Sequence, residues 1–247
     1  MKLIRQSALG AAVALFGMCL ARGTLAEAPQ PAETLKKMGV PVQQDSQGAV
    51  RWIEATKGEL GDQALGLLPG LPKLEWLEIS GGSVTPSGLA WLRECKSLRR
   101  LYIHDVNLGG TELEWLSDLA GLEALSLQRT GIDGKALKDL KVTATLKVLN
   151  LSGDDIVDGD LDQIAGIRGL EVLALADTKV TGTGIAKLQG MSRLNELNLM
   201  RCSIQDEDLE YFLTMPNLRI VYAEGCNLSD MAVQMMVTRF PMLAIFR

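Results

Sequence analysis

Apolar residues recur along this chain with a fixed period of 24 residues. Each unit has apolar residues at its positions 1, 4, 6, 11 and 16, and eight such units follow one another without an insertion. Their first residues are Val50, Leu74, Leu98, Leu122, Leu146, Leu170, Leu194 and Leu218. A strict tandem period predicts a solenoid, because no single unit can bury its own apolar face and each must cover its neighbour's.

The pattern inside each unit predicts one strand followed by one short helix. Positions 4 and 6, such as Leu149 and Leu151, alternate with polar residues as a half-buried strand does. Positions 16 and 19, such as Leu161 and Ile164, are three apart, which suits one face of a short helix. Aspartates stand just before that helix at Asp62, Asp158, Asp206 and Asp230. We expect these carboxylates to cap the helix that follows each of them.

The motif L-x-x-L-x-L followed by a further aliphatic residue resembles the leucine-rich repeat family throughout residues 50–241. Residues 170–191, LEVLALADTKVTGTGIAKLQGM, are most similar to exported bacterial members. The resemblance implies an α/β fold, a horseshoe-shaped solenoid with parallel strands on its concave face and short helices on its convex face. It also implies a binding scaffold without a cofactor. Position 9, often asparagine in the family, is never asparagine here, so the inner-turn hydrogen bonds must differ.

The first 26 residues have the three parts of a signal peptide. Lys2 and Arg5 precede an apolar run at 8–21, and small residues end at Ala26. The run is too short to span a membrane comfortably. We therefore predict cleavage after Ala26 and a secreted or periplasmic protein with no stable membrane insertion, with an uncleaved membrane anchor as the alternative.

Residues 27–49 are expected to form a linker and an N-terminal cap. A proline-containing stretch at 27–31 precedes a predicted helix at 32–38 and a predicted hairpin that begins with a strand at 40–44. Such a cap would shield the first open end of the core, as terminal units of solenoids require.

The repeat domain is expected to span 50–247, as eight repeats and a final strand cut short by the terminus. An open strand edge can pair with another chain, so self-association through residues 243–247 is one possibility. Capping by the side chains of Phe240 and Phe246 is the other.

Charge argues against a nucleic-acid partner. The chain has 25 basic and 30 acidic residues, and removal of residues 1–26 takes away three basic and no acidic residues, leaving 22 and 30. A net negative chain of this kind would be repelled by a phosphate backbone. Another protein is the expected partner, with an envelope polymer as a more distant alternative.

Positions 3, 5 and 7 of each strand point away from the core, so they form columns about 4.8 Å apart on the concave face. The columns are large, aromatic and charged at the N-terminal end and small in the middle. The predicted partner-binding residues are Trp52, Glu54, Trp76, Glu78, Arg100, Tyr102 and His104. Trp, Tyr and Arg dominate binding hot spots, and Arg100 is expected to lie against Trp76. Packing of Trp52 and Trp76 beneath the N-terminal cap is the alternative.

Two further tryptophans, Trp91 and Trp115, share position 18 on the helical side. They are expected either to pack between neighbouring helices or to form an apolar ridge on the convex face, which would be a second interface. Self-association through this ridge or through the C-terminal edge is the alternative function.

No enzyme is predicted. His104 is the single histidine, and its neighbour in column 7 is Ser80. A serine nucleophile also uses a carboxylate behind the histidine and an oxyanion hole, and the sequence assures neither.

No metal or cofactor is predicted either. Cys202 and Cys226 occupy position 9 of adjacent units, but a structural zinc site takes four ligands. Two buried thiols or a disulfide are the expected states. The acidic run at 154–162 invites calcium but lacks the glycine and distal glutamate of an EF-hand loop.

Overall fold

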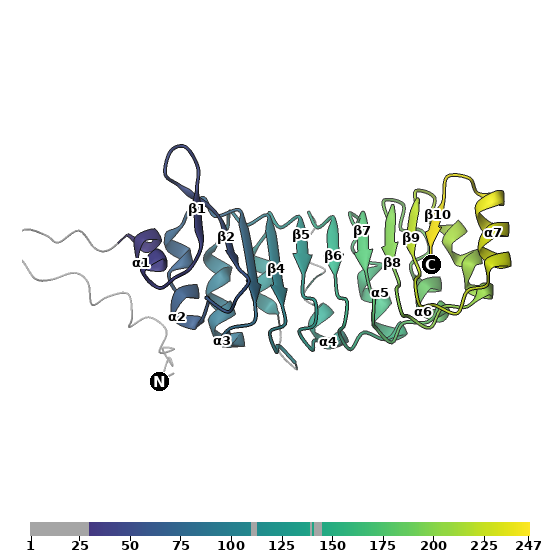
Figure 1. The fold of residues 1–247 in the computed structure, drawn as a ribbon, viewed down its shortest axis with the longest axis horizontal. Helices are drawn as coiled ribbons and strands as arrows, with labels where there is room; N and C mark the ends of the chain where they lie inside the picture. Colours follow the sequence, from purple (N-terminus) through teal and green to yellow (C-terminus); the bar gives the residue numbers. More distant parts are fainter. Residues whose placement is uncertain (1–29, 110–112, 139, 141–144) are drawn as a thin grey trace, which may run out of the picture. The chain divides into compact units, whose positions relative to one another are not determined.

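The computed structural model describes residues 30–109, 113–138, 140 and 145–247. Residues 31–247 form one unit, in which ten strands lie side by side in chain order in a single open sheet (Figure 1). Strand β1 pairs antiparallel with β2, and every later neighbour is parallel. The predicted α/β repeat architecture is confirmed.

The strands are β1 (Val42–Gln44), β2 (Val50–Ala55), β3 (Trp76–Ser80), β4 (Arg100–His104), β5 (Ala124–Ser126), β6 (Val148–Asn150), β7 (Val172–Ala174), β8 (Glu196–Asn198), β9 (Ile220–Tyr222) and β10 (Ala244–Phe246). The α-helices are α1 (Pro31–Lys37), α2 (Asp62–Leu65), α3 (Pro86–Leu89), α4 (Gly134–Leu137), α5 (Leu161–Ile164), α6 (Gly182–Lys187) and α7 (Asp230–Arg239). Short 3₁₀ helices are η3 (Leu68–Gly70), η4 (Ala90–Glu94), η5 (Glu114–Asp118), η7 (Asp158–Asp160) and η8 (Asp206–Thr214).

The strand register follows the period of the sequence. Leu77 lies opposite Leu101, and Leu101 lies opposite Leu125, each 24 residues further along the chain. Equivalent positions of successive units therefore become neighbours in space. The columns predicted on the two faces of the sheet follow from this register.

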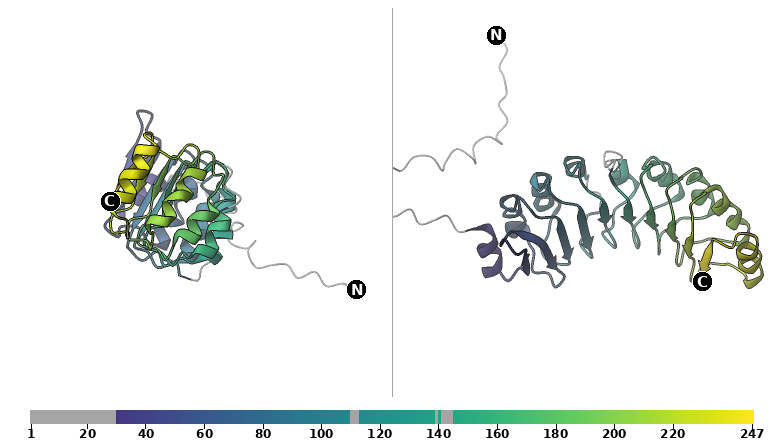
Figure 2. Two further views of the ribbon diagram at one scale, coloured as in Figure 1. Left: turned by 90° about the vertical axis from the view of Figure 1, so that its right-hand side faces the viewer. Right: turned by 90° about the horizontal axis from the view of Figure 1, so that it is seen from above.

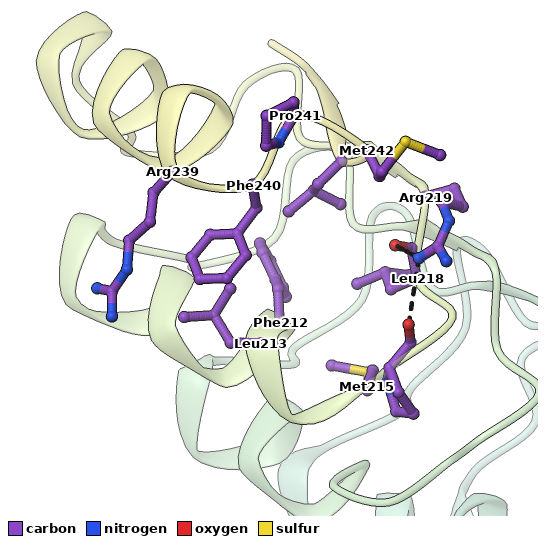
Figure 3. Close-up of a pocket in the computed structure, with 11 residues that line it drawn as sticks. Phe212, Leu213, Met215, Leu218, Arg219, Arg239, Phe240, Pro241 and Met242 are labelled. Carbon is purple, nitrogen blue, oxygen red and sulfur yellow. Dashed lines mark hydrogen bonds between the residues drawn. The ribbon is translucent and has the colours of Figure 1, made fainter.

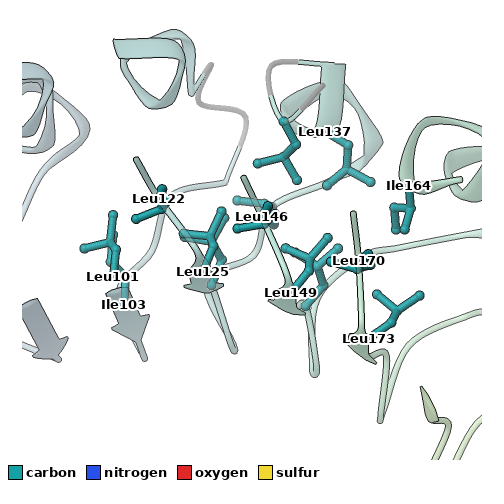
Figure 4. Packing of buried hydrophobic residues seen from close by; sticks show 14 of the residues in the cluster. Leu101, Ile103, Leu122, Leu125, Leu137, Leu146, Leu149, Ile164, Leu170 and Leu173 are labelled. Atoms are coloured by element: carbon teal, nitrogen blue, oxygen red, sulfur yellow. The ribbon is translucent and has the colours of Figure 1, made fainter. Parts of the chain in front are cut away.

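One continuous apolar core runs between the strands and the helices. Leu122, Leu146 and Leu170 open three successive units and are fully buried. Figure 4 shows them beside the strand residue Leu149, with Ile164 reaching down from α5 on the other side. The core is thus built from the repeated apolar positions that define the period.

Residues 31–247 curve with the strands on the inner side and the helices on the outer side (Figure 2). Neighbouring strands are about 4.8 Å apart, whereas packed helices need about 8–10 Å. The helical side of each repeat is therefore wider than its strand side, and stacking such wedges bends the sheet into an arc.

The N-terminal elements lie where the sequence predicted a helix and a hairpin. Leu35 of α1 and Val40 after it are buried in the first part of the core, at 0% and 2% exposure. Gln43 of β1 pairs opposite Trp52 of β2. The predicted signal segment, residues 1–26, lies outside the described residues.

The aspartates that precede the helices form different contacts from those expected. Asp62 accepts hydrogen bonds from the backbone N–H and the hydroxyl of Thr85, at 2.8 and 2.6 Å. Asp158 binds Thr181 in the same way, at 2.7 and 2.7 Å. Each acceptor therefore ties its own unit to the N-cap residue of the next unit, and the expectation that these two aspartates cap their own helices is wrong.

Position 9 supplies the inner-turn hydrogen bonds without asparagine. The thiol of Cys202 donates to the carbonyl of Leu175, at 3.0 Å, and Thr178 donates to the same carbonyl, at 2.7 Å. Cys226 donates to the carbonyl of Leu199, at 3.1 Å. Both cysteines are free thiols in this structure. Short side chains at position 9 thus donate to backbone carbonyls of the preceding unit or of their own turn.

Within the described part of the chain, no helix combines the length and the apolar character needed to cross a membrane.

Candidate functional site

The seven predicted binding residues lie together on β2, β3 and β4, on the strand face that points away from the core. We call them the N-terminal concave patch. The register places Trp52, Trp76 and Arg100 in one column and Glu54, Glu78 and Tyr102 in the next. His104 ends β4 in a third column, opposite Ser80.

Trp76 is the centre of the patch. The Arg100 guanidinium lies over its ring, with Cζ 5.3 Å from the ring centroid, as the sequence predicted. Tyr102 packs against the same tryptophan at a centroid distance of 5.3 Å and a tilt of 43°. Tyr102 in turn meets His104 edge-on at 6.2 Å. These contacts hold four side chains of the patch in one continuous layer.

Trp52 lies at the outer side of this layer and is 37% exposed. Its partner on the neighbouring strand β1 is Gln43, so the N-terminal hairpin flanks Trp52 without covering it. The alternative that Trp52 is packed beneath the N-terminal cap is therefore wrong. Trp76 is half-buried, and its indole N–H is enclosed with no hydrogen-bond partner among the described residues.

His104 contacts a residue that the sequence analysis did not pair with it. Its Nε2 lies 3.0 Å from the hydroxyl oxygen of Ser126 on β5, and its Nδ1 lies 4.0 Å from Glu78. Burial lowers the pKa of His104, although the nearby Glu78 and Asp105 carboxylates act in the opposite direction. The histidine is therefore neutral near pH 7.

Ser126 could have been found from the sequence by considering diagonal neighbours on adjacent strands, which long side chains can reach. The order Glu78, His104, Ser126 is that of a carboxylate, a base and a hydroxyl. However, Ser126 is only 3% exposed, and 4.0 Å between Glu78 and Nδ1 exceeds a hydrogen bond. The hydroxyl of Ser126 is therefore not open to a substrate.

The middle of the strand face offers little to a partner. Ala124 and Ser126 are small and buried. The amide oxygens of Asn150 and Asn198 accept hydrogen bonds from the backbone N–H two residues later, at 2.9 and 3.0 Å. These polar side chains are thus used within their own turns, and the large side chains of the strand face lie toward its two ends.

The expected packing of the two tryptophans on the helical side holds for Trp115 alone, and the alternative of a ridge formed by both is wrong. Trp115 is 3% exposed and packs in the core, whereas Trp91 is 53% exposed. The indole N–H of Trp115 is buried without a hydrogen-bond partner among the described residues.

The acidic run has partners within the chain. Asp155 pairs with Lys179 and Asp162 with Lys187, both at 2.8 Å. Asp160 accepts the backbone N–H of Val157 at 2.9 Å. Where the structure describes the chain, no group of three or more histidine, cysteine, aspartate or glutamate side chains is arranged to hold a metal ion.

The C-terminal end of the sheet is open along β10, which pairs with β9 on one side. Phe246 stacks on Tyr222 at a centroid distance of 5.4 Å and remains 53% exposed. Met231, Met235 and Met242 nearby are 71%, 67% and 72% exposed.

A cavity of about 240 Å³ lies at this end of the molecule. Figure 3 shows the side chains of Phe212, Leu213 and Phe240 around it, with Arg239 at one side. Arg239 lies over Phe240, with Cζ 5.2 Å from the ring centroid. The lining is therefore mainly apolar, with cations at its margin.

Comparisons with known proteins agree on the fold. A family model described as "Leucine Rich repeat" matches residues 192–213. The structure of internalin C2 from Listeria monocytogenes is similar with a TM-score of 0.59 and 19% identity, and the match covers 88% of this chain and 92% of that one. A leucine-rich repeat protein from Leptospira interrogans gives a TM-score of 0.54 and 18% identity, over 74% of this chain and 51% of that one. A search of curated proteins finds no match. The resemblance predicted from the repeats is confirmed.

Proposed function

We propose that this chain, a leucine-rich repeat protein, is an exported, non-enzymatic scaffold that binds another protein mainly through the N-terminal concave patch. Its leucine-rich repeat fold supports a scaffold role, and the signal-like composition of residues 1–26 supports export.

The observation that carries the proposal is the contact layer of Trp76, Arg100 and Tyr102 on an open face. Large aromatic and arginine side chains contribute most of the binding energy in protein interfaces. Here they stand on neighbouring strands, which hold them in fixed positions before a partner arrives. Binding of a partner therefore costs little free energy for ordering the side chains of this surface.

The test is affinity capture of binding proteins by the full chain and by a W76A/R100A variant. Glu196→Ala is the matched control, because Glu196 occupies the same column as Trp76 and Arg100 but on the distant strand β8. We expect a protein captured by the wild type and by the control to be lost by the double variant. Circular dichroism checks that the variants are folded. Capture that is equal for all three proteins would refute the proposed site.

A second candidate function is self-association through the C-terminal edge. It is favoured by the open β10 strand beside the exposed Met242 and Phe246. Light scattering would measure the mass of the full chain and of a chain lacking residues 243–247. A larger mass that falls on deletion would support this function, and an unchanged mass would argue against it.

A further inference from the structure

We infer that the protein bound at the N-terminal concave patch inserts a lysine or arginine side chain between Glu54 and Glu78. The inference rests on the proposed function and adds the chemistry of the partner.

Glu54 and Glu78 stand directly opposite each other on β2 and β3. Adjacent strands are about 4.8 Å apart, so the two carboxylates occupy neighbouring positions on one face. Like charges placed directly opposite each other destabilise a sheet. Nothing in the packing of the strands requires this pair, because both side chains point away from the core.

At several other positions the chain places opposite charges 24 residues apart and joins them. The joined pairs include Arg51–Glu75, Lys147–Glu123, Arg129–Asp105, Lys179–Asp155 and Arg201–Asp177. The nearest atoms are 3.2 Å apart in Lys147–Glu123, 2.6 Å in Arg129–Asp105 and 2.8 Å in Lys179–Asp155. On the strands of the patch, by contrast, Glu54 and Glu78 place two like charges in register.

The chain itself does not neutralise the pair. Within the described residues, Glu54 forms no ion pair, and the ionic neighbour of Glu78 is His104 at 4.0 Å. His104 is neutral near pH 7 because burial lowers its pKa. Arg100 is held over the ring of Trp76. Two negative charges therefore remain available to a cation from outside.

The aromatic neighbours select the kind of cation. Trp52 stands two residues before Glu54 on the same strand and is 37% exposed, whereas the ring of Trp76 is already covered by Arg100. Indole faces attract ammonium and guanidinium groups and also cover the apolar stem of a lysine or arginine. A basic side chain would use both the carboxylates and the exposed ring of Trp52. A neutral saccharide would use the ring and leave the charges unmatched, and a polyanion would be repelled.

The test uses a library of random dodecapeptides displayed on phage and selected on the full chain. Selected peptides are then synthesised, and their dissociation constants are measured for the wild type and for E54Q/E78Q, W76A/R100A and the control E196Q. Tetra-N-acetylglucosamine is the neutral saccharide probe. Glutamine keeps the shape of glutamate and removes its charge, so E54Q/E78Q should be at least as thermally stable as the wild type. A purely structural role for the pair would give a loss of thermal stability instead.

The inference expects selected peptides that share a lysine or arginine. Their affinity should fall at least tenfold in E54Q/E78Q, and equally when that residue is replaced by glutamine, but not in E196Q. Peptides lost by W76A/R100A but bound unchanged by E54Q/E78Q would overturn the inference and leave the proposed function standing. Saccharide binding that needs Trp76 but not the glutamates would also overturn it. Binding that survives in both double variants would overturn the inference and the proposed function together.

Discussion

Replacing Asp154 by asparagine should stabilise the protein, and the gain should grow with pH. Asp154 is 4% exposed, and its Oδ1 accepts the backbone N–H groups of Thr130 and Gly131 at 2.8 and 2.7 Å. Its Oδ2 is buried with no hydrogen-bond partner among the described residues. Burial raises the pKa of Asp154 to about 6, although these donors act in the opposite direction.

The direction of the effect follows from linkage. An unfolded aspartate has a pKa of about 3.9, so the folded state holds the proton more tightly than the unfolded state. Stability is therefore highest where Asp154 is protonated in both states and falls as pH rises through about 4 to 6. Two pKa units correspond to about 3 kcal/mol in total, and roughly half of this is lost between pH 5 and pH 8.

Asparagine has no charge to bury and supplies a donor where the carboxylate has none. At the same repeat position, Cys202 and Cys226 donate to the carbonyl 27 residues earlier. The equivalent carbonyl for residue 154 is that of Leu127, which the asparagine amide could reach. The free energy of unfolding of D154N should therefore exceed that of the wild type by about 1–3 kcal/mol at pH 8, with a smaller difference at pH 5.

Urea unfolding of the full chain at pH 5 and pH 8 measures both differences. D155N is the matched control, because Asp155 is exposed and pairs with Lys179 at the surface. Such a pair contributes at most about 1 kcal/mol, with little change over this pH range. A D154N variant that is no more stable than the wild type at pH 8, or a difference that is the same at both pH values, would refute the reasoning.

Three further predictions concern the core. Leu149→Ala removes a fully buried side chain and should lower the free energy of unfolding by about 2–5 kcal/mol in the same urea assay. A loss below about 1 kcal/mol would contradict the packing of Leu149. Gly88→Ala places a Cβ 1.9 Å from the Asp62 carboxylate, so it should cost about 1–3 kcal/mol, and Asp62→Ala in the same chain should recover part of that cost. Burial raises the pKa of Cys95 to about 12, so iodoacetamide at pH 8 should label it only after unfolding; mass spectrometry of the peptide that contains Cys95 would show this, and rapid labelling of that peptide in the native chain would contradict the burial.

The period alone determined the order of the strands, their register and the composition of the strand face. Side chains alternate along a strand and equivalent positions stack at one spacing, so Trp76 had to lie beside Arg100 once the repeats were aligned. The N-terminal concave patch was therefore predictable as a set of neighbours. Its role in binding remains a proposal.

Tertiary structure decided which contacts and what exposure individual side chains have. Trp91 in η4 and Trp115 in η5 share one repeat position, yet one is exposed and the other is buried. Asp62 reaches forward to the next repeat, and His104 reaches diagonally to Ser126. Such contacts depend on helix rotation and side-chain rotamers, which packing sets and a linear period does not encode.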